Sequence, residues 1–89
     1  MNTTPEVIKQ LEQALNITRS AEDMIENLIA VHDYQDVTQV VTQAAAALLE
    51  TALLLMQSQD EAALDMLERA EDLIDAVYGT IDSDLDDTD

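Results

Sequence analysis

The feature that most constrains the fold is the near absence of chain breakers: the 89 residues hold one glycine, Gly79, and one proline, Pro5. Between these two positions nothing in the backbone chemistry opposes a helix. Aromatic residues, which favour strands, are limited to two tyrosines. Because Gly and Pro mark turns and aromatics mark sheets, this composition predicts an all-α protein built from a few long helices.

The first predicted helix runs from about residue 5 to residue 32, because apolar residues recur there in steps of three and four. Thr4 followed by Pro5 and Glu6 is a typical helix start, with a capping hydroxyl, a proline in the first turn and an acid at the positive end of the helix dipole. Ser20 followed by acids can also cap a new helix. The pattern therefore leaves open a break near Ser20.

The second predicted helix spans about residues 34–57 and is apolar around most of its circumference. Four consecutive alanines, Ala44–Ala47, let a neighbouring helix approach closely. A helix of this kind is covered on several sides, so we expect it at the centre of the fold. Two flanking helices do not suffice to cover it completely, and a homodimer through helix 34–57 is one of the states that the pattern allows.

The third predicted helix covers about residues 59–79, since Ser58 and Glu61 form a capping box in front of an apolar run. Gly79 is placed to end it. The last ten residues, 80–89, are acidic with little to bury, and we expect a disordered tail. Residues 1–79 thus form a single domain, predicted as a small antiparallel three-helix bundle, because short connections favour antiparallel neighbours.

The charge balance limits the partners: 20 acids and 3 bases give a formal net charge of −17. Approach to nucleic acid or to an anionic membrane surface would be repulsive, so we expect no direct binding to either. An electrostatic partner must be basic. No basic stretch followed by an apolar core opens the sequence, so we expect a cytoplasmic protein without a secretory signal.

The sequence offers few residues that could carry catalysis or bind a cofactor. The chain has one histidine, His32, no cysteine and no glycine-rich phosphate loop, so we expect neither an enzyme nor a cofactor. The paired carboxylates of the helices fall opposite the apolar positions, where solvation explains them without a dedicated metal site. His32 fits a solvated turn residue or a partner of the helix dipole better than a catalytic base.

The most specific pattern is a row of acids in the third helix, spaced by four, three, four and three residues: Glu61, Asp65, Glu68, Asp72 and Asp75. This spacing places five carboxylates on one helix face at axial intervals of about 5–6 Å. One interpretation is a solvated face that provides solubility or adaptation to high salt. The other is a charge array that imitates a nucleic-acid backbone and occupies the basic surface of a nucleic-acid-binding protein.

In composition, the chain is similar to small acidic phage and mobile-element proteins that inhibit restriction or CRISPR effectors. This likeness favours a nucleic-acid mimic or inhibitor, of anti-restriction or anti-CRISPR character, with those five acids as the partner-binding residues. A third hypothesis is a dimerisation, adaptor or chaperone-like module. Such a module would bind through the apolar surface of helix 34–57, while the acids serve solubility.

Overall fold

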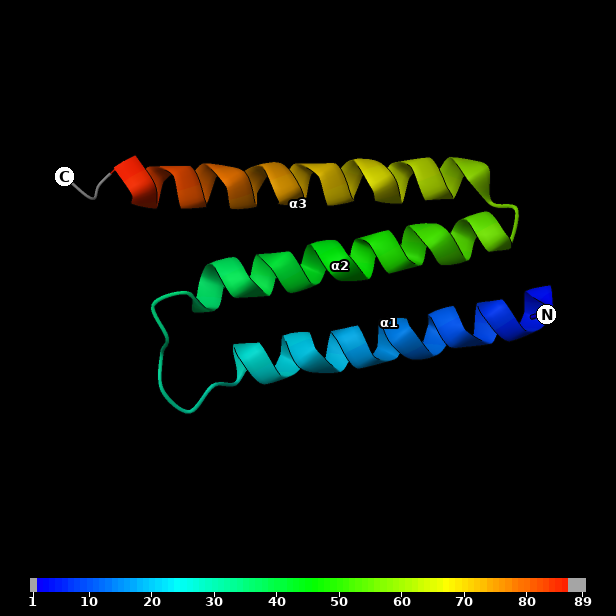
Figure 1. Cartoon of the computed structure of the whole chain (residues 1–89), viewed down its shortest axis with the longest axis horizontal. Helices are drawn as coiled ribbons and strands as arrows, with labels where there is room; N and C mark the ends of the chain where they lie inside the picture. Colours follow the sequence, from blue (N-terminus) through cyan, green and yellow to red (C-terminus); the bar gives the residue numbers. More distant parts are fainter. Residues whose placement is uncertain (1, 87–89) are drawn as a thin grey trace.

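The computed structural model describes residues 2–86, with side chains placed for residues 2–83. Within that range the chain forms three α-helices and no strand: α1 (Thr4–Glu26), α2 (Gln35–Met56) and α3 (Asp60–Asp86). The predicted all-α class and the number of helices are confirmed (Figure 1).

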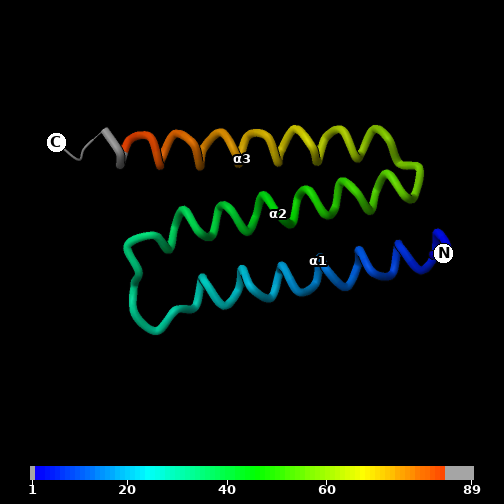
Figure 2. The backbone as a smooth tube through the Cα atoms, viewed as in Figure 1, coloured from blue at the N-terminus to red at the C-terminus, as the bar shows by residue number. Residues whose placement is uncertain are grey.

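The three helices lie side by side with α2 in the middle, and each successive helix reverses the direction of the chain (Figures 1 and 2). Helix α2 contacts both neighbours, whereas no contact joins α1 to α3 within the described residues. The helical bundle is therefore an open layer, with α2 exposed on the two faces that α1 and α3 do not cover.

Helix α1 begins one residue earlier than predicted and is continuous. Its N-cap is Thr3, whose Oγ1 accepts a 3.4 Å hydrogen bond from the backbone N–H of Glu6. Pro5 lies in the first turn, where its missing N–H costs no helical hydrogen bond. The helix passes Ser20 without interruption, so the alternative of a break at that point is excluded.

The predicted end of the first helix, residue 32, is wrong, because α1 stops at Glu26. At this end, Asn27 is the C-cap, and its Nδ2 donates to the carbonyl of Asp23 at 2.8 Å. From the far side of the loop, Nε2 of Gln35 donates to the carbonyls of Ile25 and Glu26 at 3.0 and 3.4 Å. The Gln35 amide thus satisfies carbonyls that a further helical turn would have used, while the Asn27 amide adds a second donor to the carbonyl of Asp23, which already accepts from the backbone N–H of Asn27.

The connection between α2 and α3 is a Schellman motif rather than the predicted capping box. The N–H of Gln59 donates to the carbonyl of Leu54 at 2.9 Å, and the N–H of Ser58 donates to that of Leu55 at 3.1 Å. Ser58 has φ 59°, the left-handed conformation that usually belongs to glycine at this position. Ser58 therefore ends α2, and an N-cap of α3 would need an extended backbone there instead.

The predicted boundary at Gly79 is also corrected, because α3 continues through this residue to Asp86. Gly79 does not have a positive φ, and a left-handed glycine is what would have ended the helix there. The described part of the predicted acidic tail is thus the last segment of α3. Residues 87–89 of that tail lie outside the described residues.

The core consists mainly of small side chains. Leu15 of α1 is the one large apolar residue that is buried among the described residues, and Thr51 is a buried polar one whose Oγ1 donates to the carbonyl of Ala47 at 2.8 Å. The other buried positions are alanines: Ala44, Ala46, Ala47, Ala63 and Ala70. Small residues allow close approach of α2 and α3, but they remove little apolar area from water.

Candidate binding surfaces

The five predicted partner-binding acids lie along one edge of the molecule. Ala63 and Ala70, on the inner side of α3, are buried at 2% and 0% exposure, which fixes the face that packs on α2. Positions 61, 65, 68, 72 and 75 fall on the opposite side of the helix at 100° per residue, and all five side chains are exposed. The structure therefore brings together every residue of the predicted row, as a solvated edge that we call the acidic edge.

The acidic edge is long and closely spaced. From Glu61 to Asp75 it covers about 21 Å at 1.5 Å per residue, with one carboxylate about every 5 Å. This interval is shorter than the Debye length of about 8 Å at physiological ionic strength. A partner in contact with the edge would consequently experience a nearly continuous line of negative charge.

Little positive charge offsets this line. Arg69 shares a shallow hollow with Asp65, Glu68 and Asp72. Within the described part of the chain, however, the one ion pair joins Arg19 of α1 to Glu50 of α2 and involves no residue of the acidic edge. The carboxylates of the acidic edge are therefore open to an external cation.

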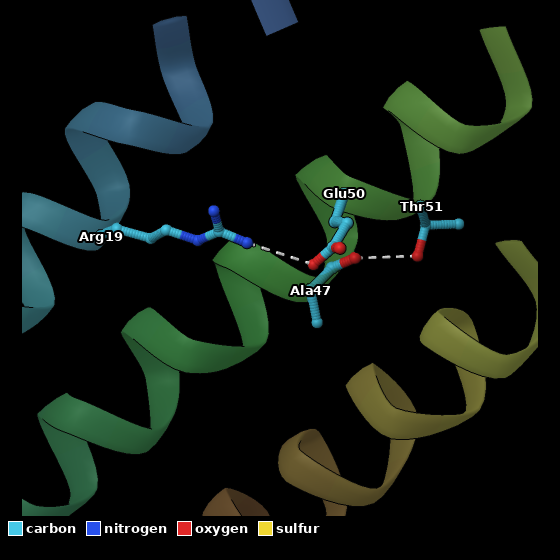
Figure 3. A network of polar contacts seen from close by, with 4 residues as sticks. All are labelled: Arg19, Ala47, Glu50 and Thr51. Carbon is cyan, nitrogen blue, oxygen red and sulfur yellow. Dashed lines mark hydrogen bonds and ion pairs between the residues drawn. The ribbon is translucent and has the colours of Figure 1, made fainter. Parts of the chain in front are cut away.

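The two faces of the layer differ in chemistry. One face carries a polar groove over α2, closed at its sides by α1 and α3, with these lining residues: Arg19, Glu22, Gln43, Ala46, Ala47, Glu50, Met66 and Arg69. Nη2 of Arg19 lies 3.4 Å from Oε2 of Glu50 (Figure 3), and Nε2 of Gln43 donates to Oε1 of Glu22 at 3.0 Å. These contacts tie α1 to α2, while Arg69 lines the same groove from α3 without an ion pair among the described residues.

The opposite face of α2 is apolar and uncovered. We call it the α2 stripe, and it consists of Val41, Ala45, Leu48, Ala52 and Leu55. Its three large side chains remain 48%, 43% and 55% exposed, in chain order. The expectation that helix 34–57 would be covered on several sides is thus met on only two sides. Ala44 and Thr51 of the same helix are buried instead.

Metal-ligating side chains do not cluster among the described residues. No group of three or more histidine and acidic side chains is close enough there to hold a metal ion. His32 is exposed in the loop between α1 and α2, where its Nδ1 accepts a 3.0 Å hydrogen bond from the backbone N–H of Tyr34. This contact makes His32 part of the turn that leads into α2.

Helix α2 is also the one described helix that is long and apolar enough, by length and composition, to cross a membrane. Core helices of bundles pass the same test. Here the helix packs between α1 and α3, and Glu50 lies in its second half.

No protein-family model matches the chain, and neither the curated proteins nor the solved structures contain a match to it. Function must therefore be inferred from the two exposed surfaces, the acidic edge and the α2 stripe.

Proposed function

We propose that the protein is a non-enzymatic binding protein that occupies the basic surface of a nucleic-acid-binding protein, with the acidic edge as its contact surface. The observation that carries this proposal is the common orientation of Glu61, Asp65, Glu68, Asp72 and Asp75, all exposed and all directed away from α2. An edge of about 21 Å is as long as about six phosphates of one DNA strand, which recur every 3.4 Å along the duplex axis. A groove that binds a strand backbone has the charge and the length to accept this edge.

Electrostatic attraction would raise the rate of association with a basic partner and favour that partner over others. A strongly negative chain is drawn toward a basic groove and repelled by nucleic acid, so it competes with nucleic acid for the groove without binding it. An inhibitor of restriction or CRISPR effectors would need this behaviour.

The test uses two triple variants that remove the same charges. Glu68→Gln, Asp72→Asn and Asp75→Asn neutralise the acidic edge, while Glu12→Gln, Asp23→Asn and Asp33→Asn neutralise three exposed acids of α1 and its following loop. The immobilised protein is incubated with a nuclease-treated lysate at low salt. Bound proteins are then eluted with duplex DNA or with a salt gradient.

We expect basic proteins that DNA releases, and elution at moderate salt, because screening weakens contacts between exposed charges. The edge variant should lose most of this binding, whereas the α1 and loop variant should keep it, with the same helical circular dichroism in both. Equal losses in the two variants, or bound proteins that DNA does not release, would contradict the proposal.

A second candidate function is an adaptor or chaperone-like module that binds a partner through apolar contacts. The exposed large residues of the α2 stripe favour it, because soluble monomers rarely leave a contiguous apolar surface of this kind uncovered. In that case a captured partner would persist at high salt and in the edge variant, and would be lost with Leu48→Ser.

A further inference from the structure

The α2 stripe has a regular internal pattern. Its residues follow steps of four, three, four and three, and large and small side chains alternate: Val41, Ala45, Leu48, Ala52 and Leu55. This is the spacing with which one helix packs along another, each large side chain entering a space between side chains of the neighbour. The alanines provide such spaces along this face.

A single copy also exposes more surface than its mass predicts. The accessible surface is 6600 Å² for 9.8 kDa. A compact monomer of that mass would expose about 5,200 Å², so the excess is about 1,400 Å². A standard protein interface buries about 800 Å² on each partner, and covering one face of this layer would account for such an area.

The small size of the core also indicates that the α2 stripe is covered. Apart from Leu15, the buried apolar residues of the described chain are alanines, while the large residues of the α2 stripe stay exposed. Burial of the α2 stripe would give the protein the large-residue core that one copy lacks.

From the alternation of large and small residues, the excess exposed area and the alanine core we infer that a second copy of the chain covers the α2 stripe. The two α2 helices lie antiparallel about a twofold axis, so that Leu48 of each copy packs on Ala45 or Ala52 of the other. Antiparallel pairing sets large side chains against small ones along the whole stripe. Parallel pairing would set leucine against leucine and leave gaps between the alanines.

The distribution of charge permits this pairing despite the net charge of each copy. The α2 stripe contains no ionisable residue. On α3 the adjoining row is Leu64, Glu71 and Tyr78, which lies away from the groove residues Met66 and Arg69. Glu71 is then at the rim of the interface. The acidic edges of both copies point outward, where water and salt screen their repulsion.

The inference is independent of the proposed function, because it rests on the α2 stripe and not on the acidic edge. It would nevertheless give the assembly two acidic edges. It also assigns the α2 stripe to self-association, so that an adaptor function would need another surface.

Sedimentation equilibrium of the purified chain in physiological salt tests it, over a wide range of protein concentration. We expect twice the mass of 9.8 kDa. Leu48→Glu should give the monomer mass, because it places a charge in the interface. Ala45→Trp should do the same by filling the space that receives Leu48, although it adds apolar surface.

The matched control is Ile29→Glu in the loop between α1 and α2, a residue that is more exposed than Leu48 and lies outside the packed helices. This variant should keep the dimer mass. If the variants of the stripe unfold on losing the partner, the unchanged chain should show a melting temperature that rises with its concentration. A monomeric parent chain, an assembly larger than a dimer, or a dimer that survives both Leu48→Glu and Ala45→Trp would overturn the inference.

Discussion

Ser58 occupies a backbone position that favours glycine, and Gly79 occupies a helical position that favours a residue with a side chain. Ser58 takes the left-handed conformation, with φ 59°, that ends α2. Gly79 lies inside α3 with a negative φ, and a Cβ added to it would meet no atom within 4 Å. The backbone is therefore strained at Ser58, which has a side chain, and is less restrained at Gly79, which has none.

We therefore predict that both Ser58→Gly and Gly79→Ala stabilise the protein. The first change relieves the left-handed residue and the second improves helix propensity, each by about 0.5–1 kcal/mol. The midpoint of urea unfolding should rise in each variant with an unchanged m-value.

The control for this prediction is Ser20→Gly, an exposed position inside α1. Glycine should lower the free energy of unfolding there by about 0.5 kcal/mol. Destabilisation by Gly79→Ala would show that Gly79 is needed for its conformation, as the predicted helix end required.

Among the elements, the contact between α2 and α3 depends on the smallest side chains of the molecule. Ala63 and Ala70 are fully or almost fully buried against α2, while Ala76 of the same helix is exposed. Close packing of this kind leaves no room for additional methylene groups.

Ala70→Leu should accordingly destabilise the protein by about 1–3 kcal/mol through overpacking. Ala76→Leu, the matched change on the exposed side, should alter stability by less than about 0.5 kcal/mol. Thermal unfolding followed by circular dichroism measures both. A neutral Ala70→Leu would contradict the close approach of α2 and α3.

At this scale, the sequence predicted which segments are helical and which face of α3 carries the acids, because both follow from local periodicity. It did not predict where α1 ends, since Gln35, nine residues beyond Glu26, caps that end from across the loop. Nor could it show that Gly79 continues a helix, because glycine is compatible with either conformation. The α2 stripe is open because α1 and α3 do not touch each other within the described residues. Local sequence periodicity could not predict this arrangement of helices.

For the whole molecule, a net charge of −17 opposes folding and self-association alike. Acids four residues apart, such as Glu68 and Asp72, repel each other by a few tenths of a kcal/mol per pair. Several such pairs amount to about 1 kcal/mol, which corresponds to about 4–8 °C in a chain of this size.

Sodium chloride should therefore raise the melting temperature by several degrees between low and physiological ionic strength, because salt screens this repulsion. The edge variant with Glu68, Asp72 and Asp75 neutralised should melt higher at low salt and respond less to added salt. Differential scanning calorimetry provides the comparison. A melting temperature that salt leaves unchanged would show that the acids repel each other too weakly to matter.

The lack of contact between α1 and α3 has a consequence for how the chain comes apart. Among the residues that the structure describes, contacts run only from each helix to its sequential neighbour, as in a linear array of repeats. Helix α1 can detach while the hairpin of α2 and α3 keeps all of its own contacts, and the contact between α2 and α3 is the more extensive of the two. The protein therefore has a built-in order of opening, in which the N-terminal helix is released first and the C-terminal hairpin, with its acidic edge, remains folded longest.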